Sequence, residues 1–360
     1  MLATSVAGAE VAAASPAPTF TFYTPPTPDS ATQRIVTGSD GNLWFTEQTG
    51  NAIGRITPAG VITEFVLPTA EAQPIGITAG PDGNLWFTEA AVAQIGTITP
   101  SGVITEYPSG AGTQPEDIVT GPDGNLWVTE PGHGNIDVFS PAGAVLHEYP
   151  TAGPVPVRIV VGADNNLWFT ELATAGIGRM DISGSLTQIS TPDPYYYLAE
   201  GADGNVWLST TSLGHSGGTI TPAGVFTTVP SIANEYAITA GPDGDIWADN
   251  GRGTAVDEIN PAGTVVASYA LPAGYTGSYL HDITEGPDGN IWFTTDDGRI
   301  GLLDLHPTAV AVPTLPTTGI GPGSWVAGGI AVVAVLLGLV ALLIGVRRRP
   351  RRLSQHPSSN

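Results

Sequence analysis

The sequence contains no cysteine and no lysine. The absence of cysteine excludes disulfide scaffolds, thiolate zinc sites, iron–sulfur clusters and thiol nucleophiles. The absence of lysine excludes Schiff-base chemistry and Walker-type nucleotide loops. Basic residues are few: eleven arginines stand against 33 carboxylates, and five of these arginines lie in the last fourteen residues. The formal net charge of −22 repels a phosphate backbone, so nucleic acid is excluded as a general partner.

One phrase recurs seven times, in forms such as GPDGNLWFTE, GADNNLWFTE and GADGNVWLST. Its tryptophans follow one another at intervals of 39 to 45 residues, at Trp44, Trp86, Trp127, Trp168, Trp207, Trp247 and Trp292. A period near forty, built from short strands and turns, is typical of the blades of a β-propeller. The spacing therefore predicts seven blades around one axis.

The second unit contains the four strands that such a blade requires. We expect strands at residues 77–79, 85–89, 94–98 and 103–107, where small, β-branched and aromatic side chains gather. The Pro-Asp-Gly-Asn and Thr-Pro-Ser-Gly segments between them suit tight hairpin turns, because glycine and asparagine tolerate positive φ. The Asp-x-Gly turns lack the further ligands of a calcium loop. The predicted fold class is all-β: a seven-bladed β-propeller over residues 19–304.

Closure of the ring can be predicted as well. The last unit stops at Leu303 without an outer strand. Residues 19–25, TFTFYTP, resemble the outer strand of the first unit, VITEFVLP, and precede all seven units. We expect this N-terminal strand to complete the last blade, since closure removes the exposed edges of an open array.

The N-terminus resembles an export leader. Residues 1–18 are rich in alanine, and Ala12 to Ala14 are a candidate signal-peptidase site. No positively charged region precedes this site, so we expect the basic part of the leader to lie upstream of Met1.

The C-terminus resembles a cell-wall sorting signal. After a Pro/Thr-rich linker at 305–314, the chain reads Leu315-Pro316-Thr317-Thr318-Gly319, which matches the LPxTG motif of Gram-positive surface proteins. An uncharged run at 325–346 is long enough for a transmembrane helix, and the arginine-rich tail at 347–360 is the positive cytoplasmic flank that such a helix requires.

This resemblance implies two partners and a location. Sortase would cleave between Thr318 and Gly319 and join Thr318 covalently to peptidoglycan. The precursor would be held in the membrane through 325–346, and the mature propeller would be extracellular and anchored to the cell wall. A plain membrane anchor is the alternative, and it also places the propeller outside the cell.

Propeller geometry brings the starts of the inner strands and the ends of the second strands to one face. These positions lie fourteen residues apart in every unit: Gln33/Glu47, Ile75/Glu89, Glu116/Glu130, Val157/Glu171, Tyr196/Thr210, Tyr236/Asn250 and His281/Thr295. Tyrosines gather in the later units, at Tyr195, Tyr196, Tyr197, Tyr236, Tyr275 and Tyr279. An aromatic wall beside carboxylates suits an organic ligand with flat or sugar-like faces.

The residues at this predicted mouth fall into two groups. The four glutamates that end the second strands of units one to four either form a carboxylate ring or cap the blade interfaces, and the structural role is favoured for each one. The candidate ligand-binding residues are Gln33, Glu116, Tyr196, Tyr236 and His281. His281 is the only histidine among these inner-strand positions, where a side chain could act as a base or bind a substrate.

The segments NAIGRITPAGVITEF at 51–65 and IGITAGPDGNLWFTE at 75–89 resemble the blade signature of the virginiamycin B lyase (streptogramin lyase) family, and the resemblance covers about residues 19–304. It implies a seven-bladed propeller that linearises cyclic depsipeptide antibiotics by elimination at their ester bond. A base would remove a proton, while Mg²⁺ and an acid would polarise the ester.

The resemblance also implies four catalytic positions. The family's last-blade histidine matches His281. Its glutamate falls on Asp296, or on Thr295 with a gap of one residue. A second histidine falls on Arg299, and the histidine of the preceding blade falls on Tyr236. Arginine cannot bind Mg²⁺ or serve as a base, so only one of the four positions is kept.

Two functions are therefore expected. The first is an extracellular binding or interaction module that holds a small molecule, glycan or peptide at the mouth. The alternative is a Mg²⁺-dependent lyase in which His281 is the base and Asp296 helps to hold the metal. A lactone hydrolase of the gluconolactonase kind ranks below both, because no matched set of metal ligands for it is found.

Overall fold

The computed structural model describes residues 16–307, except residues 111, 211–214, 234–236, 252 and 276–278. Most of the leader, the LPTTG motif, the apolar run and the arginine-rich tail therefore lie outside the described residues. Within the described ranges, no helix has the length and apolar character that crossing a membrane requires.

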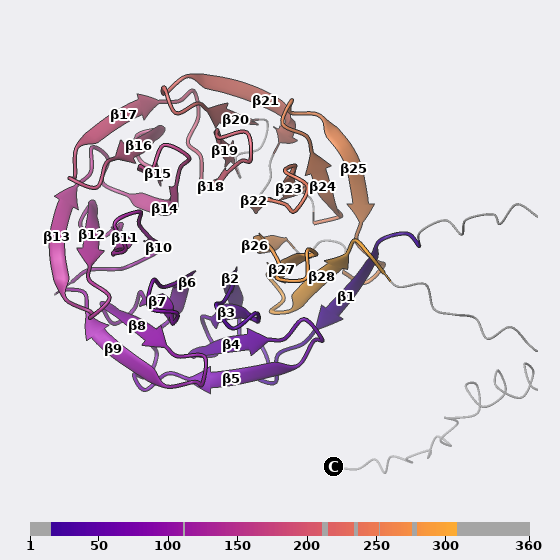
Figure 1. Ribbon diagram of the computed structural model, residues 1–360, viewed down its shortest axis with the longest axis horizontal. Coiled ribbons are helices and arrows are strands. Elements are labelled where there is room, and N and C mark those ends of the chain that lie inside the picture. The colour runs from indigo at the N-terminus through magenta and orange to yellow at the C-terminus, as the bar shows by residue number, and fades with distance from the viewer. Residues whose placement is uncertain are drawn as a thin grey trace, which may run out of the picture. The chain divides into compact units, whose positions relative to one another are not determined.

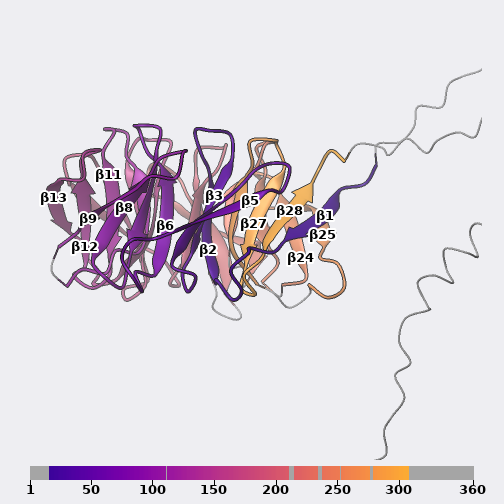
Figure 2. The same ribbon diagram turned by 90° about the horizontal axis from the view of Figure 1, so that it is seen from below.

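The described residues form seven four-stranded antiparallel sheets arranged as blades around an axis (Figure 1). The inner to outer strands of the first three blades are β2 (Thr32–Thr37), β3 (Leu43–Glu47), β4 (Ala52–Ile56) and β5 (Ile62–Val66); β6 (Pro74–Ala79), β7 (Leu85–Glu89), β8 (Gln94–Ile98) and β9 (Ile104–Pro108); and β10 (Ile118–Thr120), β11 (Leu126–Glu130), β12 (Asn135–Phe139) and β13 (Val145–Pro150). The strands run between the two faces of the ring, where the turns gather (Figure 2).

Blades 4 to 7 repeat this order. Their strands are β14 (Pro156–Val161), β15 (Leu167–Glu171), β16 (Gly176–Met180) and β17 (Leu186–Ser190); β18 (Tyr197–Glu200), β19 (Val206–Ser209), β20 (Ser216–Ile220) and β21 (Phe226–Ala233); β22 (Ile238–Ala240), β23 (Ile246–Asp249), β24 (Ala255–Ile259) and β25 (Val265–Ala270); and β26 (Leu280–Glu285), β27 (Ile291–Thr295), β28 (Ile300–Asp304) and β1 (Thr19–Tyr23). The predicted all-β, seven-bladed propeller is confirmed.

The ring is closed by its two ends. β1 pairs antiparallel with β28, in a register that runs from Thr19 opposite Asp304 to Tyr23 opposite Ile300. Blade 7 thus takes its outer strand from the start of the chain, as the match between residues 19–25 and an outer strand predicted. The outer edge of β28 is therefore paired, and blade 7 has four strands like the other six blades.

The recurring Asp-Gly turn is held together by its own side chains. In all seven blades the turn aspartate accepts a hydrogen bond from the indole Nε1–H of the tryptophan four residues later, at 3.0 to 3.4 Å. The same carboxylate oxygen accepts the backbone N–H two residues on. The aspartates therefore stabilise hairpin turns, and the repeated phrase needs no calcium to explain it.

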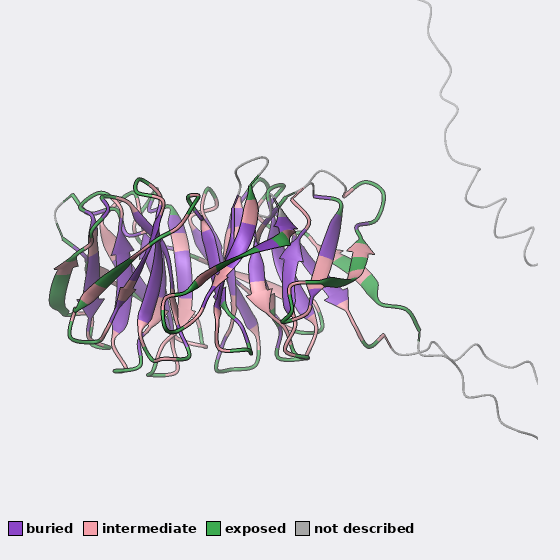
Figure 3. Ribbon diagram, turned by 90° about the horizontal axis from the view of Figure 1, so that it is seen from above, coloured by how far each residue is buried: buried purple, intermediate pink, exposed green. Residues whose placement is uncertain are grey.

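The core is a set of blade interfaces. Each of the seven blade tryptophans is at most 1% exposed and packs into the blade that follows, so that Trp44 lies against Ile77 and Phe87 of blade 2. The ring closes in the same way, because Trp292 of blade 7 packs with Ile35 and Phe45 of blade 1. Buried residues accordingly fill the strands within the ring, and exposed ones lie in the loops and outermost strands (Figure 3).

Candidate functional site

A cavity of about 530 Å³ opens where the inner strands begin, on the predicted mouth face. Its lining comes from six of the seven blades: Gln33, Gln48, Ile75, Glu116, Arg158, Tyr196, Tyr197, Tyr279, Leu280, His281 and Asp296. The cavity is large enough for a drug-sized organic ligand. We refer to it as the mouth cavity.

Local backbone irregularities aim the side chains into the mouth cavity. The pairing of inner and second strands shifts register at the start of four inner strands, in blades 1, 2, 4 and 7. In blade 7, Leu280 pairs with Thr295 and Asp282 with Thr294, so His281 is the extra residue of a β-bulge. Bulges re-aim a side chain in this way at the rims of β-structures.

These bulges also set the register between the inner and second strands. The residues fourteen apart are not cross-strand partners, because Glu47 lies opposite Thr32, Glu89 opposite Pro74 and Glu171 opposite Pro156. The register differs by one residue from the even spacing in the sequence. Of the inner-strand residues in these three blades, Gln33 and Ile75 line the mouth cavity and Val157 does not, and none of the three glutamates lines it.

The four glutamates are buried between strands and do not form a carboxylate ring at the mouth. Glu47, Glu89, Glu130 and Glu171 are all 0% exposed. Only Glu171 has its oxygens satisfied: Oε1 accepts the Gly153 backbone N–H at 3.0 Å, and Oε2 accepts the Thr174 hydroxyl at 3.3 Å. The structural role predicted for these glutamates fits Glu171, which caps a loop.

The other three glutamates have no hydrogen-bond partner on either oxygen. Burial, together with the neighbouring Glu64, raises the pKa of Glu47 to about 7. Burial and Glu106 raise the pKa of Glu89 to about 8, and burial and Asp137 raise that of Glu130 to about 9. These glutamates hold protons near neutral pH because burial disfavours the charged form and a second carboxyl group lies close to each of them.

His281 and Asp296 both line the mouth cavity in blade 7. Burial lowers the pKa of His281, although the carboxylate of Asp296 acts in the opposite direction. The imidazole is therefore neutral at ordinary pH and able to accept a proton. The structure thus brings together the two residues predicted to be catalytic.

Arg299 does not lie in the mouth cavity. Its guanidinium pairs with Asp297 and lies 4.0 Å from the centroid of the Tyr275 ring. Tyr275 in turn stacks on Phe22 of β1, at a centroid distance of 3.8 Å. The arginine at the position where the resemblance implied a histidine thus belongs to the closing blade.

The predicted ligand-binding residues Gln33, Glu116 and Tyr196 line the mouth cavity together with His281. Tyr236 lies outside the described residues. Two further tyrosines of the predicted aromatic wall, Tyr197 and Tyr279, also line the cavity. Tyr195 does not, because it is 1% exposed and its hydroxyl donates to the Ser216 carbonyl oxygen.

Two arginines occupy equivalent places, ten residues before the blade tryptophan, in blades 1 and 4. Arg34 donates from Nη2 to Asp117 at 2.5 Å and from Nη1 to Asp282 at 2.9 Å. These contacts tie blade 1 to blades 3 and 7, and they raise the pKa of Arg34 although burial opposes the charge. Arg158 lines the mouth cavity and is only 6% exposed.

The mouth residues do not fit a metal centre held by protein side chains. Magnesium requires near-octahedral oxygen ligands, of which carboxylates supply one or two. Asp296 comes from blade 7 and Glu116 from blade 3, and the positive charge of Arg158 acts on Glu116. No three acidic or histidine side chains among the described mouth residues bring their ligating atoms within 4.8 Å of one another.

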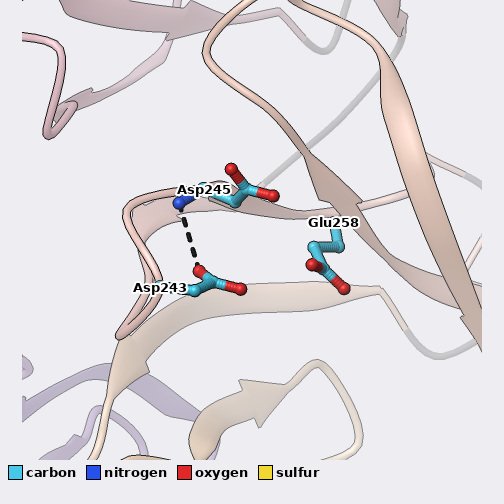
Figure 4. A group of neighbouring side chains, drawn as sticks. All are labelled: Asp243, Asp245 and Glu258. Carbon is cyan, nitrogen blue, oxygen red and sulfur yellow. Dashed lines mark hydrogen bonds between the residues drawn. The ribbon is translucent and has the colours of Figure 1, made fainter.

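Such a group exists elsewhere in the described chain, in blade 6 (Figure 4). Asp243, Asp245 and Glu258 lie together there, with the Asp245 backbone N–H donating to Asp243 Oδ1 at 3.1 Å. Glu258 accepts the hydroxyl of Tyr269 at 2.8 Å. Each side chain is at least partly exposed, and none holds a buried unpartnered oxygen, so we do not assign a metal site to this group.

The sequence reasoning missed Arg158 and Gln48. Arg158 carried a usable signal, since it is a charged residue inside an otherwise apolar inner strand, at the position that Arg34 holds in blade 1. Gln48 gave no signal in the sequence. It follows the last residue of β3, and the strand that β3 pairs with, β2, has a bulge at this end.

Comparison with known proteins supports the fold over the whole propeller. The profile of the virginiamycin B lyase family matches residues 1–197. A solved streptogramin B lyase is 30% identical, with a TM-score of 0.73, and the match covers 80% of this chain and 98% of that one. No curated protein sequence matches the chain.

Two further solved structures are informative. A catalytically inactive histidine-to-alanine variant of virginiamycin B lyase from Staphylococcus aureus, in complex with quinupristin, is also 30% identical, with a TM-score of 0.73 and coverage of 80% and 99%. Hydrazine synthase from Kuenenia stuttgartiensis shares the fold alone, at 16% identity, a TM-score of 0.62 and coverage of 78% and 97%. The chain belongs to the virginiamycin B lyase family.

Proposed function

We propose that this propeller is an extracellular binding module that takes a small organic ligand in its mouth cavity. The observation that carries the proposal is the composition of the cavity. Tyrosines 196, 197 and 279 form an aromatic wall, and Gln33, Glu116, His281 and Asp296 supply polar groups around it. A few polar groups in a largely apolar concave site are typical of ligand recognition.

The tyrosine wall gives the direct test. Glycan and peptide arrays would identify a ligand, and the Tyr196→Ala variant, alone and combined with Tyr279→Ala, should weaken its binding at least tenfold. Tyr107→Ala is the matched control, since Tyr107 stacks on Trp86 in an interface outside the mouth. Unchanged binding by the double variant would place the ligand elsewhere.

The cell-wall location is proposed from the sequence of the C-terminus. Sortase would recognise Leu315-Pro316-Thr317-Thr318-Gly319, and peptidoglycan would become attached at Thr318. Mass spectrometry of peptides released from purified cell walls should find the chain ending at Thr318 with a cell-wall amine attached. Recovery of the intact tail at 347–360 in the membrane fraction would instead support a plain membrane anchor.

A second candidate function is elimination at the ester of a cyclic depsipeptide. Two observations favour it: His281 is neutral and lines the mouth cavity, and Arg299 is held outside it. His281 would take a proton from the carbon next to the one that bears the ester oxygen. The electrons of that C–H bond form a C=C double bond, the C–O bond breaks, and a carboxylate leaves.

Magnesium is proposed only together with this second function, because the acidic and histidine side chains described at the mouth cavity do not bring their ligating atoms close together. Incubation of the protein with a type B streptogramin, with Mg²⁺ and with a chelator, tests the reaction. Elimination yields a linear product of unchanged mass, whereas hydrolysis adds one water. The His281→Ala variant should abolish product formation, and absence of product from the wild-type protein in both conditions would rule the lyase activity out.

A further inference from the structure

Arg158 is a buried cation with no carboxylate partner among the described residues. Its side chain is 6% exposed, and it forms no ion pair in the described part of the chain. Two of its nitrogens, Nε and Nη1, are fully enclosed and have no hydrogen-bond partner. Removing a guanidinium from water without compensating contacts is costly, so its position requires an explanation.

The equivalent residue in blade 1 shows what a structural arginine looks like at this place. Arg34 binds both aspartates of the ring, Asp117 and Asp282, across blades 1, 3 and 7. Asp117 lies in the blade next to Arg158, yet its Oδ2 is already shared by Arg34 and the Ile159 backbone N–H. Both aspartates therefore pair with Arg34, and neither pairs with Arg158.

Aromatic rings only partly compensate Arg158. Its guanidinium carbon lies 5.2 Å from the ring centroid of Tyr196 and 5.0 Å from that of Tyr197. A ring face attracts the cation but does not accept the in-plane N–H bonds that a guanidinium presents. Glu116, which also lines the mouth cavity, has a pKa that burial raises although the charge of Arg158 lowers it, and this weakens Glu116 as a counter-ion.

Arg158 and both tyrosines line the mouth cavity, so a ligand there meets the cation and the rings together. We propose that Arg158 is the recognition point of an organic carboxylate, with the carboxylate of the ligand at the guanidinium and its apolar body against Tyr196 and Tyr197. Nη2 is the one guanidinium nitrogen outside the enclosed, unpartnered pair, and a carboxylate is the acceptor that forms the strongest hydrogen bond with such a charged donor. The inference rests on the proposed function, because it assigns a chemical class to the ligand of the same cavity.

Matched acids and amides provide the test. The purified full-length protein would be titrated with phenylacetate, 3-(4-hydroxyphenyl)propionate and N-acetyl-L-phenylalanine, each beside its neutral primary amide, and binding followed by ligand-observed NMR. At least one acid should bind tenfold or more tightly than its amide. Arg158→Met should remove that difference, and Arg158→Lys should keep part of it.

Arg179→Met is the matched control, since Arg179 is a blade 4 arginine that lies over Trp168 and pairs with Asp164 outside the mouth. It should leave the preference for the acid unchanged. The melting temperature separates recognition from folding: Arg158→Met should keep or raise it, because an uncompensated charge is lost, whereas Arg34→Met should lower it. A lower melting temperature for Arg158→Met would make Arg158 a structural residue and overturn the inference.

Two outcomes distinguish this inference from the function on which it rests. Equal binding of acids and amides, with both weakened by Tyr196→Ala, would overturn the role of Arg158 and leave the mouth cavity as a binding site. Absence of binding by every acid would also overturn the role of Arg158, and the array experiment would then decide the proposed function by itself.

Discussion

The two ends of the second strand in each blade differ sharply. At the turn end, one aspartate satisfies the tryptophan indole and the turn backbone in all seven blades. At the other end, Glu47, Glu89 and Glu130 bury carboxyl oxygens without partners. The turn end is the same in all seven blades because its hydrogen bonds hold the hairpin together. The other end buries carboxyl groups without hydrogen-bond partners, which is unusual in a stable core, and it borders the face that carries the mouth cavity.

The largest expected effect is a dependence of stability on pH that comes from the buried glutamates Glu47, Glu89 and Glu130, which we call the unsatisfied end. In the folded protein the pKa values of Glu47, Glu89 and Glu130 are raised from 4.5 to about 7, 8 and 9. The folded state therefore binds more protons than the unfolded state between pH 4.5 and 9, and stability falls as pH rises through this window. One pKa unit is about 1.4 kcal/mol, so the shift of Glu47 alone is of the order of 3 kcal/mol.

Calorimetry across this range checks the sign. The melting temperature should be highest near pH 5, since the turn aspartates Asp40, Asp123 and Asp164 have lowered pKa values and lose their stabilisation only below their unfolded pKa of 3.8. The lowered pKa of His281 acts against the trend, but it is one group against three. A melting temperature that rises steadily from pH 5 to pH 9 would contradict the burial of these three glutamates.

A substitution at the satisfied end should have the next largest effect. Asp82→Ala removes the acceptor of the Trp86 indole and of the Asn84 backbone N–H. Leaving a buried donor unpaired costs about 1–3 kcal/mol, and chemical denaturation at pH 7 would measure the loss. Asp82→Asn, which keeps one acceptor oxygen, should lose less, and equal losses for both variants would indicate that the hydrogen bonds are not what stabilises the turn.

Replacing one glutamate at the unsatisfied end sharpens the contrast. Glu130→Gln removes a group that has to stay protonated, so it should raise the free energy of unfolding more at pH 8 than at pH 5. Glu171→Gln is the control, since Glu171 accepts bonds from Gly153 and Thr174 and its loss should not stabilise the protein. Stabilisation of both variants to the same degree would remove the distinction between the two glutamates.

The smallest effect on stability is expected at the mouth. His281 lies on a bulge and lines an open cavity, so His281→Ala should change the free energy of unfolding by less than about 1 kcal/mol while it removes ligand binding or lyase activity. Thermal melting beside the functional assay measures both. A large loss of stability would show that His281 supports the closing blade more than the cavity.

The fold could be predicted because the residues that repeat in the sequence are the same residues that form the turns and the blade interfaces. Each tryptophan is part of a turn and of a blade interface, so an even spacing of tryptophans specifies both the strands and the ring. The strands at 85–89 and 94–98 were predicted with their observed bounds. The closing strand was predicted because residues 19–25 look like an outer strand that has no blade of its own.

The site was harder to predict, because it depends on departures from the repeat. Even spacing left two interpretations open for the second-strand glutamates, a carboxylate ring or caps at the blade interfaces, and it could not show that all four are buried. Gln33, Glu116, Tyr196 and His281 were placed at the cavity by position alone. The missing partner of Arg158 could not be read from the sequence, since it depends on which arginine the two aspartates reach.

The pairing of β1 with β28 has a consequence for biosynthesis. Thr19 and Asp304, which face each other in this pair, are separated by almost the whole propeller in the chain. The first strand to leave the ribosome therefore stays unpaired until the last one has emerged. Earlier blades can assemble against their neighbours in order, but the circle is locked only at the end, and a prematurely ended chain would present an unpaired β1 to other molecules.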